Sequence, residues 1–368
     1  TGKRIELFNN TQIDMLNIFE QNKRGGICMI SKRYAKANNK YMKNHNPKKP
    51  SIYIIYLDAN NLYGWAMSQY LPIGNFAYED PNTFNKDKIM EWADDAKRGL
   101  YIVFDADYPD ELHDLHNDYP FAPENIKGAY SPFMNKLRTK HTIKEDKSVK
   151  LIPNLYNKTK YGAHYRLLKF YLNHGLVLKK VHTVISYDQE PWLESYIDKN
   201  SKLRAKKGAT DFEKDFFKLL NNSIYGKTCE NIRNRRDIKL CTTAKKAQRL
   251  FNKPKYKDHT IFKDDELIAV EMAKTKIKYD KPVYLGTCIL DLSKLLMYEF
   301  HYDFIKTMYK DKANLLFTDT DSLCYEIQTE DVYEDMLKHK DKFDFSEYTK
   351  THKCYDETNK KVIGKFKD

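Results

Sequence analysis

Runs of hydrophobic residues alternate with polar stretches along the chain and predict both strands and helices. A dense apolar run at 52–57 ends at Asp58 and is typical of a strand buried on both faces. A second apolar run, at 176–187, predicts another strand. Apolar residues at helical spacing predict helices at 165–172 and 285–305. The pattern is therefore that of a mixed α and β protein.

Capping signals mark the starts of two more helices. Thr210 and Glu213 match the capping box, in which the two residues satisfy each other's exposed backbone donors. The helix that follows is predicted to run from 211 through Tyr225. Near the N-terminus, Thr11 precedes an apolar-periodic run that Gly25-Gly26 follows, which predicts a capped helix ending in a glycine turn.

Two short apolar runs, 315–317 and 323–325, enclose a Thr-Asp-Thr-Asp-Ser segment and predict a hairpin with carboxylates at its turn. Strand alternation places Asp319 and Asp321 on one side. Two close carboxylates repel each other, so such a site needs a cation or a raised pKa. With Asp58 as a third carboxylate they would form an oxygen cage for Mg²⁺. The alternative is an ordinary Asp-rich exposed turn.

One face of the helix 211–225 combines positive charge with an aromatic ring. At 100° per residue, four of its side chains form a narrow polar stripe opposite an apolar face. The stripe consists of Lys214, Lys218, Asn222 and Tyr225, and the apolar face of Phe212, Phe216, Leu219 and Leu220. Lysine suits the phosphates of a nucleotide, and the aromatic ring can stack on a base. The alternative is a solvated amphipathic face.

Composition narrows the function classes. The 368 residues suffice for two to three domain-sized units, and Lys plus Arg exceed Asp plus Glu by 64 to 51. The net charge of +13 favours a polyanionic partner such as nucleic acid, although a merely soluble basic protein has the same property. No run approaches the ~20 apolar residues that span a bilayer, so no membrane partner is expected. The polar, Lys- and Asn-rich stretch 35–50 predicts a surface loop.

The six cysteines are scattered and contain no C-x-x-C pair, which argues against a zinc ribbon or a redox dithiol. A chain of this length does not need disulfides for stability, so reduced thiols in an intracellular, reducing compartment are expected.

Three motifs, in this order, resemble those of family B DNA polymerases. The family patterns are D-x-x-S-L-Y-P, K-x-x-x-N-S-x-Y-G and D-T-D-S. Here they are Asp58-Ala59-Asn60-Asn61-Leu62-Tyr63-Gly64, Lys218-Leu219-Leu220-Asn221-Asn222-Ser223-Ile224-Tyr225-Gly226 and Asp319-Thr320-Asp321-Ser322. Asn61 and Gly64 depart from the Ser and Pro of the first pattern.

Further features resemble the protein-primed branch of that family, found in phages, adenoviruses, linear plasmids and Maverick/Polinton-type elements. Lys23-Arg24-Gly25-Gly26 is similar to the branch's Tyr-x-Gly-Gly motif, with Lys in place of Tyr. Long stretches at 72–150 and 228–280 lie where the branch carries insertions that contact the priming protein or enclose the DNA. The segment Gly364-Lys365-Phe366-Lys367-Asp368 looks most like Maverick/Polinton-type enzymes.

The resemblance implies an α+β polymerase right-hand fold: an antiparallel palm sheet with helical fingers and inserted subdomains. The palm sheet would contain the strand ending at Asp58, the hairpin and the strand 176–187, backed by the helix 285–305. The implied units are a pre-palm segment (1–50), palm parts (51–71, 151–200 and 281–368), fingers (201–227) and insertions (72–150 and 228–280). The proofreading exonuclease and the thumb are expected to lie outside the chain.

The resemblance also implies roles for individual residues in template-directed synthesis from dNTPs. Catalysis and two Mg²⁺ ions, or Mn²⁺ in their place, are assigned to Asp58 and Asp321, with Asp319 assisting. Nucleotide binding is assigned to Leu62, Tyr63, Lys214, Lys218, Asn222 and Tyr225, with Tyr63 excluding a ribose 2′-hydroxyl. DNA binding is assigned to Arg24, Gly25, Gly26, Lys206, Lys207, Ser223, Gly226 and Ser322. The expected partners are primer–template DNA, dNTP and a priming protein.

Other readings of the same motifs remain open. A catalytically weak fragment could bind DNA or a priming protein without turnover. A two-metal nuclease also uses acidic clusters, but it gives the lysine stripe and Tyr63 no role. A reverse transcriptase would carry adjacent aspartates, whereas Thr320 separates Asp319 from Asp321.

Overall fold

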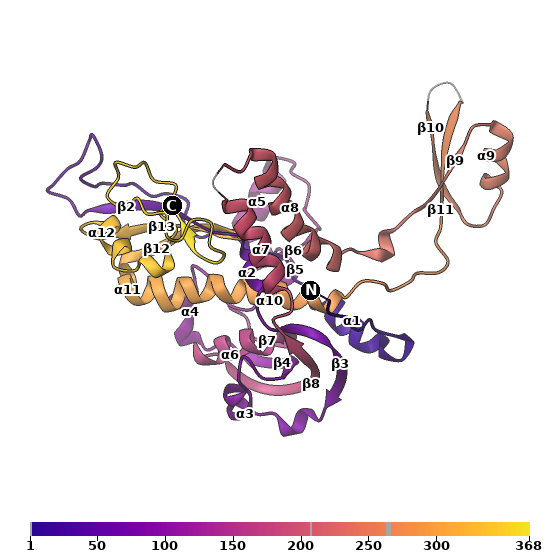
Figure 1. Cartoon of the computed structure of the whole chain (residues 1–368), viewed down its shortest axis with the longest axis horizontal. Coiled ribbons are helices and arrows are strands. Elements are labelled where there is room, and N and C mark those ends of the chain that lie inside the picture. The colour runs from indigo at the N-terminus through magenta and orange to yellow at the C-terminus, as the bar shows by residue number, and fades with distance from the viewer. Residues whose placement is uncertain (1, 207, 263–265) are drawn as a thin grey trace.

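The long helix α10 (Val283–Tyr298), which continues as a π-helical segment (Glu299–Lys306), runs through the middle of the molecule. The computed structural model describes residues 2–206, 208–262 and 266–368. Two antiparallel sheets lie on different sides of this helix (Figure 1). The predicted helix 285–305 is confirmed, with a change from α to π geometry near its end. The mixed α and β fold with antiparallel sheets is confirmed as well.

The first sheet, called the palm sheet below, carries the motifs. Its strand order is β1 (Cys28–Ile30), β12 (Ala313–Asp319), β13 (Ser322–Gln328), β2 (Ile52–Ala59) and β14 (Phe366–Lys367), with every neighbouring pair antiparallel. The predicted strand 52–57 and the predicted hairpin are both present in it. One face is buried through Leu57, Leu323 and Tyr325, whose hydroxyl bonds His301 Nδ1 of the π-helical segment at 2.9 Å. The other face leaves Tyr56 and Phe317 exposed, so the prediction that strand 52–57 is buried on both faces is wrong.

The predicted strand 176–187 exists as β8 (Val177–Glu190), but its predicted place in the palm sheet is wrong. It lies in a four-stranded sheet of order β3 (Leu71–Glu79), β8, β4 (Arg98–Asp107) and β7 (Lys158–His164). Both edges of β8 are paired, with β3 on one side and β4 on the other. An apolar run predicts a strand but not its partner, and here the neighbours come from the stretch predicted as an insertion.

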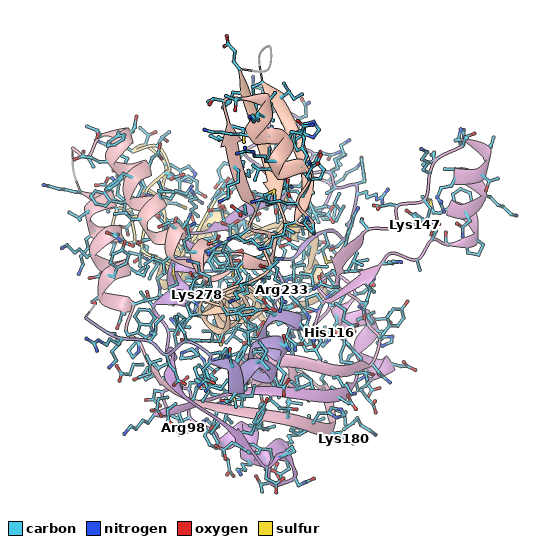
Figure 2. The ribbon with its side chains drawn as sticks, turned by 90° about the vertical axis from the view of Figure 1, so that its right-hand side faces the viewer. Arg98, His116, Lys147, Lys180, Arg233 and Lys278 are labelled. Atoms are coloured by element: carbon cyan, nitrogen blue, oxygen red, sulfur yellow. The ribbon has the colours of Figure 1, made fainter. Side chains whose placement is uncertain are left out.

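Two smaller units project from this body. One is an arm formed by β5 (Glu124–Lys127) and β6 (Val149–Ile152), with α5 (Pro132–Lys140) at its end; Figure 2 shows it extending outward near Lys147. The other contains β9 (Asp237–Cys241), α9 (Ala244–Phe251), β10 (Tyr256–Phe262) and β11 (Leu267–Met272). Its small core includes Ala247, Ile268 and Val270 and is separate from the main core. The domain boundaries given above stay predictions.

The helices confirm the local signals with two changes, both in the N-terminal helix, which ends at Gln21, so that the predicted glycine turn at Gly25-Gly26 does not terminate it. α8 (Asp211–Thr228) begins with the predicted capping box: Thr210 Oγ1 accepts from Glu213 N at 3.2 Å, and Glu213 Oε2 accepts from Thr210 N at 2.8 Å. α1 (Ile13–Gln21) is preceded by a 3-10 turn (Asn10–Gln12) whose cap is Asn9, not Thr11. The remaining helices are α2 (Leu62–Met67), α3 (Lys86–Glu91), α4 (His113–His116), α6 (Tyr165–Asn173), α7 (Glu194–Ala205), α11 (Thr307–Tyr309) and α12 (Val332–Leu337). Among the described residues, no helix is both long and apolar enough to cross a membrane.

Buried charges around α10 tie the N-terminal segment to the core. Lys294 Nζ donates to the Arg24 carbonyl at 2.8 Å, and Asp291 Oδ2 accepts from His164 N at 2.9 Å. The Arg24 guanidinium is buried, lies 3.7 Å from the centre of the Tyr161 ring and donates to the Gly162 carbonyl at 3.0 Å. This position does not support the predicted DNA contact of Arg24; it supports a structural role.

Candidate active site

The end of β2 and the β12–β13 turn bring two of the three predicted carboxylates together. Asp58 lies at the end of β2 in register with Ser322, and Asp321 lies in the turn before β13. Ala59 N donates to the Asp321 carbonyl at 2.7 Å, which fixes the turn against β2. Asp58 and Asp321 both line a cleft of about 330 Å³.

Asp319 and Asp321 do not lie on one continuous strand, as the expected alternation requires. Asp319 is the last residue of β12, whereas Asp321 follows Thr320, whose φ of 58° lies in the left-handed region. The turn therefore interrupts the strand alternation that was expected to align the two side chains. Asp319 Oδ1 instead accepts from Cys28 Sγ at 2.9 Å. Within the described residues, no group of three or more His, Cys, Asp or Glu side chains is placed to hold a metal ion.

Charge and burial give the two cleft carboxylates unusual acidities. Burial raises the pKa of Asp58, and the positive charges of Lys367 and Lys218 act against this rise. Burial also raises the pKa of Asp321, and the negative charges of Asp58 and Asp319 add to the rise. Lys367 Nζ lies 3.7 Å from Asp58 Oδ1. Two repelling, half-buried oxygen donors in one cleft fit a hard divalent cation such as Mg²⁺.

The cleft also holds part of the predicted nucleotide site. Lys218 and Asn222 from α8 and Leu62 and Tyr63 from α2 line it beside the carboxylates. The Tyr63 ring stacks on the Tyr225 ring, with centroids 4.2 Å apart and planes inclined by 20°. This stack holds the end of the α8 stripe against the first motif.

The cationic stripe on α8 is not uniform. Lys214 pairs with Asp211 at 2.8 Å and does not line the cleft, whereas no acidic partner is found for Lys218 among the described residues. Phe212 and Leu219 on the apolar face are 78% and 62% exposed. That face is therefore open, and α8 is attached to α7 by polar contacts such as the 2.9 Å bond from Asn200 to Asn221.

The residues predicted to bind DNA are dispersed. Ser322 is buried, and its hydroxyl donates to the Asp319 carbonyl at 3.3 Å. Ser223, Gly226 and Lys206 are exposed on or near the α7–α8 pair. Lys207 lies outside the described residues.

The two glycines of the pre-palm motif differ. A Cβ on Gly26 would lie 2.4 Å from Thr320 Cγ2, whereas a Cβ on Gly25 would meet nothing within 4 Å. Gly26 therefore allows the close approach of the chain to the carboxylate turn, which is a structural reason for this glycine.

The two departures in the first motif depend on each other. Asn61 has a φ of 44°, a left-handed conformation that Asn tolerates better than most residues. A Cβ on Gly64 would lie 2.2 Å from Asn61 Nδ2. Glycine in place of proline therefore leaves room for the Asn61 amide.

The cleft contains two cations that the sequence analysis did not assign. Arg204 comes from α7 and Lys367 from β14, and both line the cleft with Lys218. Helical spacing on α7 could have indicated Arg204 beside the predicted Lys206 and Lys207. Lys367 lies in the segment 364–368, which the sequence analysis used only for its resemblance to Maverick/Polinton-type enzymes. Two backbone hydrogen bonds of 2.8 Å precede β14 and hold this segment against the end of β2. Gly364 N donates to the Asn60 carbonyl, and Asn60 N donates to the Lys365 carbonyl.

Comparisons with known proteins concern the family and the fold of the chain. Residues 24–307 match the family DNA polymerase type B, organellar and viral. A phi29 DNA polymerase complexed with primer-template DNA and incoming nucleotide substrates aligns with 90% of this chain, at 14% identity and a TM-score of 0.50. The orthorhombic crystal form of phi29 DNA polymerase aligns with 99%, at 13% identity and a TM-score of 0.51. No curated protein matches the sequence.

The extent of these matches defines what they establish. The chain spans 46% and 48% of the two phi29 structures, about half their length. The family match includes Asp58 and Lys218 and ends before Asp319. The likeness to the phi29 structures concerns the fold. The family match covers most of the chain, so the chain belongs to the organellar and viral type B DNA polymerases, and the predicted resemblance to family B and its protein-primed branch is confirmed.

Proposed function

We propose that this chain is the catalytic region of a template-directed DNA polymerase that transfers dNMP to a primer 3′-hydroxyl or to the hydroxyl of a priming protein. The observation that carries the proposal is the cleft itself. Asp58 and Asp321, from two distant motifs, line it together with Lys218, Asn222 and Tyr63. These are the groups that nucleotidyl transfer needs at one place: oxygen donors for cations, a cation for phosphate and an aromatic beside the sugar.

Asp58 and Asp321 would hold the divalent metal, with Mg²⁺ as the expected ion and Mn²⁺ as an alternative. The bound metal would supply activation of the attacking hydroxyl and stabilisation of the leaving oxygen. Asp319, engaged with Cys28, contributes negative charge near Asp321. Lys367, beside Asp58, partly neutralises the pair when no other cation is bound.

The chain's own cations bind and orient the triphosphate. Lys218 from α8 and Arg204 from α7 enter the cleft, and they neutralise the phosphate charge that increases as pyrophosphate leaves. Lys214, bound to Asp211 on the exposed part of α8, lies outside the cleft and needs a movement of α8 to reach a phosphate.

Tyr63 is held in place to select the sugar. Its ring is fixed by the stack on Tyr225, and Leu62 beside it is buried. A fixed ring at the side of the cleft leaves no room for a 2′-hydroxyl, so dNTPs are preferred over NTPs. Asn222 and Tyr225 would pack on the nascent base pair.

The partners follow from the same assignment. Primer–template DNA and dNTP are the substrates, and the net charge of +13 supports a polyanionic partner. A priming protein would contact the arm or the β9–β11 unit, which project from the body. A virus or a Maverick/Polinton-type mobile element is the proposed source.

Primer extension tests the proposal. A recessed-end duplex with dNTPs and Mg²⁺ is extended by the wild type according to the template, and Asp321→Asn abolishes extension. Asp311→Asn, which changes an exposed carboxylate outside the cleft, leaves it intact. Equal extension by Asp321→Asn and the wild type would refute the assignment.

A second candidate function is DNA binding without turnover. One observation favours it: Lys367 already pairs with Asp58, and the third carboxylate is engaged elsewhere. If this candidate is correct, the protein binds DNA but incorporates no nucleotide, with Mg²⁺ or with Mn²⁺.

A further inference from the structure

A strongly basic loop joins β1 to β2 and has no role in the cleft. Residues 31–50, called the basic loop here, contain seven cationic side chains and no Asp or Glu. All seven are exposed: Lys32, Arg33, Lys36, Lys40, Lys43, Lys48 and Lys49. Lys32 pairs with Glu326 and Lys40 with Asp331, whereas the described residues give the other five no acidic partner.

The basic loop is held in one shape by its own hydrogen bonds. The Asn38 side chain donates to the Asn46 and Pro50 carbonyls at 3.1 and 2.9 Å and accepts from Asn46 N at 2.9 Å. The Asn38 and Ile52 backbones exchange bonds of 2.9 and 2.7 Å. The cations are therefore presented from an ordered scaffold, and ordering the loop costs little when a ligand binds.

The basic loop starts beside Leu316 of β12, where Ser31 N donates to the Leu316 carbonyl, and it joins β2 at Ile52, the end of that strand opposite Asp58. Glu326, the partner of Lys32, lies in register with Ile54, and Ile54 shares the exposed face of β2 with Tyr56 and Asp58. Lys32 therefore lies over the same exposed face of the palm sheet as Asp58, which is four residues further along β2 than Ile54. From Ile52 to Asp58 the strand advances six residues, or about 20 Å at ~3.3 Å per residue.

This spacing matches a duplex that lies over the exposed face. With a rise of ~3.4 Å per base pair, about six base pairs separate the cleft from the end of the basic loop that joins β2 at Ile52. We propose that the basic loop binds the sugar–phosphate backbone of the primer–template duplex about six base pairs upstream of the incorporation site. This inference rests on the proposed function, because it takes the primer terminus to lie at Asp58 and Asp321.

DNA fits this surface better than an acidic protein or an anionic membrane. The basic loop lies in line with the cleft along one sheet face, so a single continuous polyanion reaches both. Between them the exposed face offers the aromatic side chains of Tyr56 and Phe317, and its carboxylate Glu326 is neutralised by Lys32.

The test compares DNA hairpins that carry a recessed primer end, with stems of about four and about twelve base pairs, in fluorescence anisotropy titrations at several salt concentrations. The test variant combines Arg33→Gln, Lys36→Gln, Lys43→Gln and Lys48→Gln. The control variant removes the same charge from the β3–β8 sheet and from segments next to its strands, α3 and the turn before β4, on the other side of α10 (Figures 1 and 2, Lys180). It combines Lys86→Gln, Lys97→Gln, Lys160→Gln and Lys180→Gln.

The wild type and the control are expected to bind the long stem more tightly than the short one. The test variant loses about tenfold or more on the long stem and less than about twofold on the short one, and its salt slope falls by about 3.6, since four phosphate contacts at ~0.9 each are lost. Thermal unfolding verifies that all three proteins are folded.

The outcomes separate this inference from the proposed function. A test variant that keeps the wild-type preference for the long stem overturns the inference, and incorporation on the short stem leaves the proposed function standing. If the stem preference is lost only in the test variant, but the wild type incorporates no nucleotide, the basic loop binds duplex DNA and the proposed function fails.

Discussion

Replacing Lys367 by Met should make the carboxylate cleft bind divalent cations more tightly. Lys367 Nζ lies 3.7 Å from Asp58 Oδ1 and at the same distance from Glu347 Oε1, so a metal ion at Asp58 competes with a tethered ammonium group. Met keeps the length of the side chain and removes its charge. Without that charge the pKa of Asp58 rises further, because burial is then less opposed.

The size of the effect follows from the distance and the exposure. Two unit charges 3.7 Å apart interact by about 4 kcal/mol at an effective dielectric constant of ~20. The side chains of Lys367 and Asp58 are 30% and 31% exposed, so solvent screening reduces the interaction to about 1 kcal/mol. That energy corresponds to an affinity change of about fivefold.

The assay is isothermal titration of the DNA-free protein with Mn²⁺, at one pH for all variants. Lys367→Met should lower the Kd about fivefold. Lys365→Met is the matched control, since it removes the same charge two residues away, where the ammonium donates to the Asp341 carbonyl. An unchanged or weaker Mn²⁺ affinity in Lys367→Met would show that Lys367 does not compete for Asp58, and the reasoning would fail.

Four further predictions concern the same framework. Tyr63→Val should admit ribonucleotides while DNA binding stays the same; unchanged discrimination between dNTP and NTP would remove Tyr63 from sugar selection. Lys218→Ala should raise the KM for dNTP far more than the Kd for DNA, and equal losses would move Lys218 to the DNA surface. Gly26→Ala should lower stability by about 1–3 kcal/mol and impair incorporation, because its Cβ would collide with Thr320, whereas Gly25→Ala in open space should do neither. Burial raises the pKa of Glu299 from 4.5 to about 7, so the unfolded chain releases this proton first and stability falls as pH rises between these values. Urea unfolding of Glu299→Gln should lack that part of the fall, about 3 kcal/mol at pH 8, and an identical pH profile would contradict the assignment.

The sequence predicted the local features of the structure: strand and helix positions and the faces of helices. The apolar run 52–57 predicted the strand that carries Asp58 near its end, and the capping box of Thr210 and Glu213 predicted the start of α8 at Asp211. Lys218 and Asn222 share a helix face by their spacing alone. Each of these follows from contacts between residues close together in the chain.

The remaining features depend on contacts between distant segments. An apolar run does not encode which strands flank β8, so its sheet was assigned wrongly. The left-handed Thr320 moved Asp321 off the strand and beside Asp58. Lys367 reaches Asp58 only because β14 pairs with β2, and Arg24 is buried because β7 and α10 close over it. No local pattern indicates these arrangements.

The central claim is that Asp58 and Asp321 act as one cation-binding pair within the cleft. A double-mutant cycle in Mn²⁺ binding tests it most directly, with Asp58→Asn, Asp321→Asn, the double variant and Asp311→Asn as the control. If the two carboxylates share the ion, each single change removes most of the affinity and the double variant loses little more. If the losses are additive, or if either single variant binds like the control, the two aspartates do not form a common site, and the proposed active site is contradicted.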